Sequence, residues 1–471
     1  MFQRNALLWL RQWRVKSSRK PLVIRGARQV GKTSLVKAFS EEFDVFLSFN
    51  LDVAEDLALF SKELPIKELY NILLATRSQV KVNGSVLIFI DEIQNSPIAI
   101  KMLRYFYEEL PDIYVIAAGS LLESMLQINK QVSFPVGRVE YMALRPCSFD
   151  EFLGAIGENA IQSMLREANV PDVLHDKVLS LFNKYALVGG MPQVVAEYAK
   201  NEDLVALDDV YQSLIAGYYD DVEKYSRLEA NRNVIRHIIT NGWTYAAQRI
   251  VFERFAESNY KSREMGDAFR MLEKTMLLEL CYPSTHTTLP ITPDHKKKPK
   301  LLWLDTGLVN YAAGVQSEIF GKENLNDAWR GHIAEHIIGQ ELISQSNKFL
   351  ESRTFWVRES KNSQAELDYL YNSRYYGLVP IEVKSGSNAH LRSLQTFMLE
   401  SPCSFAIRFW HQSLRIDDCF VEEKDNEGTV VRVKSYKLFS LPYYYAGYLE
   451  AFLFKYLNNY LYMLIQIFEY I

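Results

Sequence analysis

The chain has 471 residues, more than one hydrophobic core usually organises, so we expect several domains. Its hydrophobic fraction of 48% and charged fraction of 23% are those of a globular protein and exclude a disordered chain. A formal net charge of -4 gives no global attraction to nucleic acid, so any contact with DNA needs a local basic patch. The four cysteines lack paired spacing, which argues against a disulfide framework or a zinc site and favours a reducing compartment, the cytoplasm.

Residues 1–155 alternate short apolar runs with helical patterns. Uninterrupted runs of Val, Ile and Leu are typical of strands buried on both faces, as in a parallel sheet covered by helices. The runs lie at 22–25, 45–50, 86–90, 114–118 and 139–144. The sequence therefore predicts an α/β fold with a parallel sheet for this part of the chain.

The central part is predicted to be mainly helical. Residues 156–225 follow a helical pattern that is broken at 189–192. Residues 233–283 read as three helices followed by a strand over 276–282, and a second strand is predicted at 300–305. Three short helices followed by a β-hairpin are the plan of a winged helix, which we assign to residues 226–315.

Residues 316–440 predict a second α/β unit. Its expected elements are a helix over 329–345, strands over 354–357, 366–371 and 375–384, a helix over 391–399 and a strand over 403–409. Residues 441–471 are rich in Tyr, Leu, Phe and Ile, but charged residues interrupt them, so they hold no clean membrane span. We expect an apolar helix packed on a neighbouring element, and a helix lying on a membrane surface is the alternative.

A glycine-rich motif lies between the strand at 22–25 and the start of a helix. Glycines let the backbone turn so that successive N–H groups face a chain of phosphates, and the helix N-terminus adds the positive end of its dipole. Lys32 is expected to reach the β- and γ-phosphates of ATP, and Thr33 to offer its hydroxyl to Mg²⁺. The predicted ATP-binding residues are Gly26, Ala27, Arg28, Gln29, Val30, Gly31, Lys32, Thr33 and Ser34, together with Asp91.

Two acidic residues follow the apolar strand at 86–90. Such a strand delivers Asp91 to its carboxyl end, where open α/β sheets bind ligands, so Asp91 is expected to hold Mg²⁺. Glu92 is placed to orient and deprotonate the water that attacks ATP. Ser120 is a candidate sensor of the γ-phosphate, and the alternative is a small residue that merely ends a strand. A small-molecule kinase is a further alternative that the glycine-rich motif allows, but a water-activating Glu92 argues against it.

Several motifs, in this order, resemble the AAA-type P-loop ATPases of bacteria and archaea that carry a C-terminal domain of unknown function. They are RGARQVGKTSL (25–35), IDEIQ (90–94), AAGSLLES (117–124), GRVEYMALRPCSFDEFL (137–153), VGGMPQVV (188–195), KLLWLDTGL (300–308), ELDYLY (366–371) and PIEVKSG (380–386). The resemblance implies an ATPase core at 1–155, a helical lid at 156–225, the winged-helix segment and a restriction-endonuclease-like domain at 316–440. It also implies a homo-oligomer in which Arg138 stabilises charge on a neighbouring subunit's γ-phosphate. A structural ion pair is the alternative for Arg138.

The C-terminal unit contains Asp368, Glu382 and Lys384, with Glu335 upstream on a helix. On a strand, residues i and i+2 point to the same face, so Glu382 and Lys384 project together. This looks like a PD-(D/E)xK nuclease site, in which Glu335, Asp368 and Glu382 bind Mg²⁺ and Lys384 positions water for phosphodiester cleavage. The alternatives are an edge strand with one solvated face and a nuclease-like fold that only binds.

Contact with DNA is expected through the C-terminal domain and through a wing containing Lys296, Lys297, Lys298 and Lys300. The expected recognition helix, Ser262–Lys274, mixes acidic and basic residues, so a winged helix that packs on protein is the alternative. His332 and His336 are interpreted as helix surface rather than metal ligands. We therefore expect ATP to act as a switch over a nuclease-like domain. The alternative is a signalling or scaffold ATPase whose C-terminal domain binds a protein partner.

Overall fold

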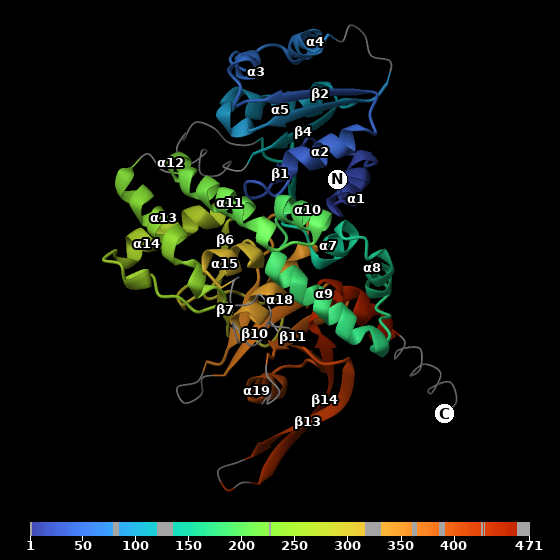
Figure 1. Cartoon of the computed structure of the whole chain (residues 1–471), viewed down its shortest axis with the longest axis vertical. Helices are drawn as coiled ribbons and strands as arrows, with labels where there is room; N and C mark the ends of the chain where they lie inside the picture. Colours follow the sequence, from blue (N-terminus) through green and yellow to red (C-terminus); the bar gives the residue numbers. More distant parts are fainter. Residues whose placement is uncertain are drawn as a thin grey trace.

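The computed structural model describes residues 2–78, 84–119, 135–225, 228–315, 331–359, 365–385, 391–424, 427 and 429–458. A sheet with its own helices lies at one end of the molecule, a helical region lies in the middle, and a second sheet lies at the other end (Figure 1). No helix within the described residues is long and apolar enough to cross a membrane.

The first sheet has five parallel strands in the order β2-β3-β4-β1-β5. They are β1 (Leu22–Arg25), β2 (Val45–Asn50), β3 (Val86–Asp91), β4 (Tyr114–Ala118) and β5 (Glu140–Ala143). Every residue of β1 and β3 is buried, as the unbroken apolar runs predict. The prediction of a parallel α/β sheet is confirmed.

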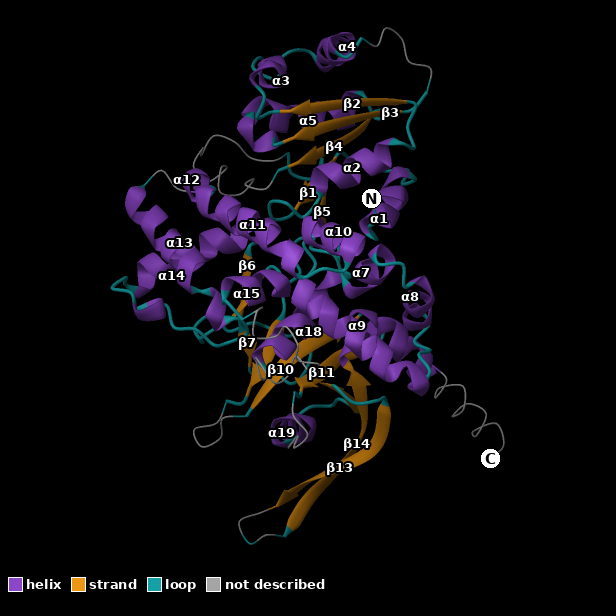
Figure 2. Cartoon of the chain, in the orientation of Figure 1, coloured by secondary structure: helices purple, strands orange, loops and turns teal. Residues whose placement is uncertain are grey.

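Helices cover both faces of this sheet (Figure 2). They are α1 (Ala6–Arg14), α2 (Lys32–Ser40), α3 (Ala54–Leu59), α4 (Ile66–Thr76) and α5 (Pro97–Glu109). Leu87 and Phe89 of β3 belong to the core under α1 and α2, whereas Ile88 and Ile90 belong to the core under α4 and α5. The strand is therefore apolar throughout because successive side chains serve opposite cores.

Six α-helices follow the first sheet within the described residues, the first at the end of the predicted ATPase core and the other five in the region predicted as a lid. They are α7 (Phe149–Ala155), α8 (Asn159–Arg166), α9 (His175–Val188), α10 (Pro192–Asn201), α11 (Asp208–Asp220) and α12 (Val222–Tyr225). A capping box of Ser148 and Glu151 begins α7. The predicted break at 189–192 is confirmed, since α9 ends before Gly189 and α10 begins at Pro192.

The next segment contains two α-helices and an antiparallel pair of strands. They are α13 (Glu229–Asn241), α14 (Ser262–Lys274), β6 (Leu278–Cys281) and β8 (Lys300–Trp303), and α15 (Thr306–Ala312) follows them. The prediction of three helices over 233–283 is wrong. Short 3-10 turns separate α13 from α14, and Arg254, Ala256 and Glu257 have positive φ angles that an α-helix does not accommodate.

The second sheet has seven strands in the order β13-β14-β12-β11-β10-β9-β7. They are β7 (Pro283–Ser284), β9 (Thr354–Val357), β10 (Glu366–Ser373), β11 (Gly377–Val383), β12 (Phe405–Trp410), β13 (Arg415–Lys424) and β14 (Val430–Pro442). The helices α18 (His332–Ser344) and α19 (Arg392–Glu400) contribute to separate cores on this sheet. The predicted second α/β unit therefore forms, with a long β13–β14 hairpin that the sequence analysis did not anticipate (Figure 1).

The end of the described chain packs on helices of the middle region. A 3-10 turn over Tyr443–Tyr448 contacts α9 and α18, and a helix continues over 449–458. Tyr443, Tyr444, Tyr445 and Tyr448 are all buried. The prediction of an apolar segment packed on its neighbours is confirmed up to residue 458, and residues 459–471 lie outside the described residues.

Candidate functional site

The glycine-rich motif forms a tight loop between β1 and α2. Gly31 has a φ of 91°, in the left-handed region that glycine tolerates best. A side chain at Gly26 would collide with the carbonyl oxygen of Leu144. Both glycines are therefore required where the backbone turns, and α2 begins immediately afterwards at Lys32. This is the geometry that places a helix N-terminus against an anion.

Lys32 is held inside this loop. Its Nζ donates hydrogen bonds to the carbonyl oxygens of Gly26 at 2.9 Å and Ala27 at 2.8 Å. Burial lowers the pKa of Lys32 to about 8, against the opposing effect of the Glu92 and Asp91 carboxylates. A phosphate would offer this ammonium a full negative charge in place of two carbonyl dipoles, so the loop is suited to an anionic ligand.

Thr33 and Asp91 meet although they come from different elements. The Thr33 hydroxyl donates to Asp91 Oδ2 at 2.6 Å, and Asp91 is the buried last residue of β3. A hydroxyl and a carboxylate at the edge of a phosphate-binding loop are hard oxygen ligands of the kind that Mg²⁺ prefers. These residues fit the predicted magnesium ion.

Glu92 follows Asp91 in a left-handed conformation, with φ 50° and ψ 43°. Burial raises the pKa of Glu92, and a hydrogen bond from the Gln94 amide opposes that rise. Non-glycine residues are held in this conformation where the surrounding structure demands it, often at functional sites. The turn directs the chain away from the sheet directly after Asp91, the predicted magnesium ligand.

A cavity of about 530 Å³ brings these groups together. Lys32, Thr33, Asp91 and Glu92 line it, as do Arg28, Gln29, Gly31 and Ser34. The lining also includes Phe2, Leu7, Leu35, Pro192, Gln193 and Ala196. The sequence analysis missed Phe2 and Pro192, and the motif VGGMPQVV was the available signal for Pro192.

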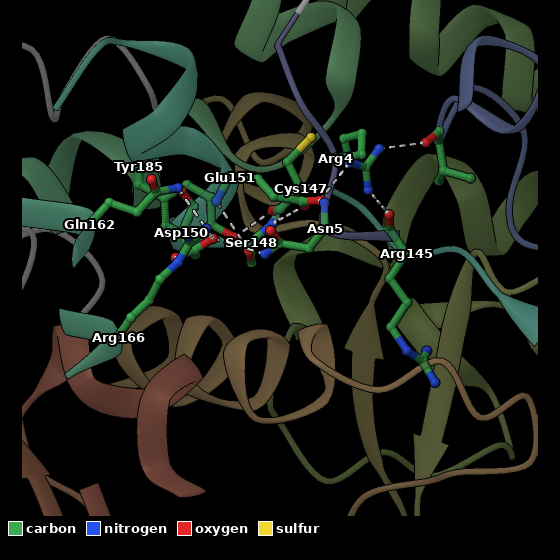
Figure 3. A network of polar contacts seen from close by, with 11 residues as sticks. Arg4, Asn5, Arg145, Cys147, Ser148, Asp150, Glu151, Gln162, Arg166 and Tyr185 are labelled. Atoms are coloured by element: carbon green, nitrogen blue, oxygen red, sulfur yellow. Dashed lines mark hydrogen bonds and ion pairs between the residues drawn. The ribbon is translucent and has the colours of Figure 1, made fainter. Parts of the chain in front are cut away.

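Arg4 joins the glycine-rich loop to the start of α7 (Figure 3). Its guanidinium donates to the Val30 carbonyl at 3.0 Å, to the Arg145 carbonyl at 2.7 Å and to Glu151 Oε1 at 2.9 Å. Glu151 also closes the capping box of α7 with Ser148. The sequence analysis assigned no role to Arg4 and so missed these contacts.

The glycine-rich loop also contacts helix α11 of the middle region and the residue that follows it. Arg28 forms an ion pair with Asp221, which lies directly after α11. The Tyr218 hydroxyl donates to the carbonyl oxygen of Arg28 at 3.0 Å. Any change in the loop on ligand binding would therefore act directly on α11.

Arg138 is not among the residues that line the cavity. Arg138 lies just before β5, at its amino end, whereas Gly26 follows the carboxyl end of β1. Because β1 and β5 are parallel, the two residues lie at opposite ends of the strands. The Nε of Arg138 is 2.7 Å from Glu108 Oε1, and 43% of its side chain is exposed. This ion pair with Glu108 is the kind of contact that is expected if Arg138 has a structural role. Ser120 lies outside the described residues.

The C-terminal residues predicted to bind metal surround an ammonium group instead. Lys300 is buried, and its Nζ lies 2.7 Å from Glu335 Oε1, 2.9 Å from Glu366 Oε1 and 3.7 Å from Asp368 Oδ1. Burial alone would lower the pKa of Lys300, but the carboxylates of Glu335, Asp368 and Glu366 raise it well above its usual value. Lys300 is therefore not part of an exposed wing, and that expectation is wrong.

The other half of the predicted nuclease site forms a second ion pair. Lys384 Nζ is 2.5 Å from Glu382 Oε1, and the backbone N–H of Val383 donates to Asp368 Oδ2 at 2.7 Å. Burial raises the pKa of Glu382 to about 8. Within the described residues, no three His, Cys, Asp or Glu side chains are arranged to hold a metal ion. Glu335, Asp368 and Glu382 are thus brought into one region, where Lys300 and Lys384 lie close to their carboxylates.

His336 corrects another expectation, because it is buried rather than on the helix surface. Its Nε2 accepts a hydrogen bond from the Trp303 N–H at 3.0 Å, and its Nδ1 lies 2.8 Å from the Thr306 hydroxyl. Burial lowers the pKa of His336 to about 3, so the ring is neutral at physiological pH.

Three family matches cover most of the chain in succession. Residues 18–153 match the family described as an AAA domain. Residues 179–319 match a domain of unknown function (DUF8612), and residues 330–423 match another (DUF4143). No curated protein matches the sequence.

Three solved structures show some likeness to this chain. The Walker-type ATPase of Pyrococcus abyssi is 16% identical, with a TM-score of 0.41 over 66% of this chain and 96% of that one. The RuvB Holliday junction branch migration motor of Thermotoga maritima is 12% identical (TM-score 0.27, 63% and 93% covered). Orc1 of Aeropyrum pernix, solved with DNA, is 12% identical (TM-score 0.23, 68% and 93% covered). These scores are too low to define the fold or the function of the whole chain.

Proposed function

We propose that the chain binds ATP with Mg²⁺ and hydrolyses it in the cavity beside the glycine-rich loop, because residues 18–153 match the family described as an AAA domain. The observation that carries this proposal is the contact of Thr33 with Asp91 at 2.6 Å, next to Lys32 and Glu92 in one cavity. Phosphate-binding, magnesium-binding and water-activating groups thus converge from separate segments of the chain.

Each residue has a distinct part in this proposal. The backbone N–H groups of the loop over 26–34 cradle the phosphates, and Lys32 leaves its two carbonyl partners to bind the β- and γ-phosphates. Thr33 and Asp91 would hold Mg²⁺, which neutralises charge on the phosphates when bound. Glu92 orients the attacking water and accepts its proton, with Gln94 holding the carboxylate. Ser120 remains the proposed sensor of the γ-phosphate.

The ATPase assignment is tested by two substitutions with one matched control. Lys32→Ala is expected to lose ATP binding, and Glu92→Gln to keep binding but lose turnover by roughly 10²- to 10⁴-fold. The control is Lys37→Ala, which removes an exposed lysine from the same helix. Full turnover in Glu92→Gln would refute the role of Glu92, and unchanged binding in Lys32→Ala would refute the site.

We propose that ATP acts as a switch over the C-terminal domain. Support comes from contacts that start at the loop and end far along the chain. Arg4 links Val30 to Glu151 at the start of α7. At the same end of α7, Asp150 accepts a hydrogen bond from Tyr448 at 3.0 Å, and the N–H of Phe149 donates to Glu341 of α18 at 3.2 Å. The first turn of α7 therefore contacts the C-terminal domain directly and the glycine-rich loop through Arg4.

For the C-terminal domain we propose a restriction-endonuclease-like fold. Support comes from the antiparallel pair β10–β11, continued by parallel β12, with α18 against the strands. The second candidate function, partner binding without cleavage, is favoured by Lys300 among the carboxylates. We propose that the domain binds a partner and does not cleave nucleic acid.

Cleavage is tested directly on single- and double-stranded DNA with Mg²⁺ or Mn²⁺, with and without ATP. We expect no cleavage by the intact chain, while ATP is turned over. Cleavage that is lost in Lys384→Ala would overturn this expectation and restore the nuclease. Its response to Lys32→Ala would then show whether ATP governs it.

DNA contact and self-assembly are further parts of the proposal. The segment 226–315 is proposed to be a winged helix, with the exposed Lys296 and Lys298 as the residues that would touch phosphates. Binding to a DNA duplex that weakens with salt and with Lys296→Ala/Lys298→Ala would support it.

We also propose a cytoplasmic homo-oligomer in which Arg138 acts on a neighbouring subunit's nucleotide.

A further inference from the structure

Lys300 is fixed in place by its backbone as well as by its side chain. It is the first residue of β8, where it pairs with Cys281 of β6 on one side and with Arg249 on the other. Its side chain is 3% exposed and its Nζ lies 4.6 Å from the centre of the Phe355 ring. A lysine held at both ends in this way cannot swing out to solvent without opening the strand pair.

The ammonium of Lys300 uses the oxygens that a metal would need. Glu335 comes from α18, and Glu366 and Asp368 come from the same face of β10. The other oxygen of Asp368 accepts the Val383 N–H. A divalent cation at these oxygens would stand a few ångströms from the ammonium, and two like charges at that distance repel strongly where water is scarce.

Glu382 is the carboxylate of this cluster whose second oxygen a cation could still bind. Its Oε1 pairs with Lys384, but its Oε2 is buried without a hydrogen-bond partner among the described residues. One carboxylate oxygen is too small a ligand set for Mg²⁺ or Mn²⁺, which need several oxygens. Glu382 nevertheless belongs in any test of metal binding.

We infer that Lys300 takes the place of the divalent cation in the C-terminal carboxylate cluster, so that this cluster is a metal-free bridge between the β6–β8 hairpin and the C-terminal domain. The bridge joins the segment matched at 179–319 to the segment matched at 330–423. The inference deepens the proposal of a binding domain, and it does not depend on ATP turnover.

Mn²⁺ without nucleotide is the probe, and the full chain is the sample. Bound Mn²⁺ is counted by electron paramagnetic resonance in the wild type, in Asp368→Asn and in Glu382→Gln. We expect the three proteins to bind Mn²⁺ equally, because the cluster holds none. Binding in the wild type that is lost in Asp368→Asn or Glu382→Gln but kept in Lys32→Ala would overturn the inference and leave the ATP site untouched.

Removing the ammonium gives the complementary result. Lys300→Met is expected to lower the Tm by about 5 °C or more, because it leaves buried carboxylates without a partner. Mn²⁺ is expected to raise the Tm of Lys300→Met but not that of the wild type, and Asp368→Asn in the same chain is expected to abolish this rise. Lys298→Met, which removes an exposed lysine nearby, is the control. If Lys300→Met does not fold, the comparison of wild type with Asp368→Asn still decides the matter.

Discussion

Arg4 and Glu151 lie 147 positions apart and form an ion pair of 2.9 Å that is almost fully shielded from solvent. Arg4 also holds the carbonyl oxygen of Val30 in the glycine-rich loop. Because a buried charge-assisted hydrogen bond is worth roughly 1.5–3 kcal/mol, we expect Arg4→Met to weaken ATP binding about tenfold or more. Binding of a fluorescent ATP analogue measures this effect.

The controls for Arg4 separate positioning from general destabilisation. Arg11→Met removes an arginine of α1 that pairs with Glu42 on the surface, and it should leave ATP affinity unchanged. Arg4→Lys keeps the charge but cannot reach three acceptors at once, so an intermediate affinity is expected. An unchanged Kd in Arg4→Met would show that the loop holds its shape without this contact.

Gln94 is expected to lower the pKa of Glu92, the proposed proton acceptor. Its amide donates to Glu92 and thereby opposes the rise that burial causes in the pKa of Glu92. In Gln94→Met that opposition is removed, so the acidic limb of the kcat/KM profile should move to higher pH and turnover at pH 7 should fall. Profiles of wild type and Gln94→Met, recorded at saturating Mg²⁺, test this. A lower kcat with an unmoved limb would mean that Gln94 acts on something other than the pKa.

Arg138 distinguishes action between subunits from a structural ion pair. A mixture of Arg138→Ala, which keeps its nucleotide site, with Lys32→Ala, which keeps its arginine, should regain turnover that neither has alone. The expected loss in Arg138→Ala alone is on the order of 10³-fold. Glu108→Gln frees Arg138 from its surface partner and should not reduce turnover. Full activity of Arg138→Ala would leave the ion pair as its sole role.

His336 should make the protein less stable in mild acid. Its pKa is about 3 in the folded chain and near 6.5 when unfolded, so the unfolded state takes up the proton first as the pH falls. Its stabilising contribution is therefore present above pH 6.5 and is lost below it, by up to about 1.4 kcal/mol per pH unit.

The measurement is the free energy of unfolding in urea at several pH values, compared between wild type and His336→Gln. Taking the difference removes the opposite trend from buried carboxyl groups such as Glu341, whose pKa is raised by burial to about 8. His295→Gln replaces an exposed histidine and is the control. A difference that is constant from pH 8 to pH 5 would contradict the prediction.

The sequence by itself determined the first sheet and its glycine-rich loop. The strand at 22–25, the glycines that follow and the acids after 86–90 are local patterns, and the chain adopts them where predicted because parallel strands must be apolar and tight turns need glycine. The β13–β14 hairpin was less readable, since much of β14 is exposed and lacks a buried alternation.

Only the tertiary structure decided the character of the C-terminal cluster. The spacing of Asp368, Glu382 and Lys384 along two strands is real, but Lys300 enters from a hairpin many residues earlier in the chain. Sequence spacing reports which side chains share a strand face, and it does not report which distant charge will be packed against them. Burial then makes that distant charge decisive, because a carboxylate cluster away from water must be neutralised by whichever cation the fold brings to it.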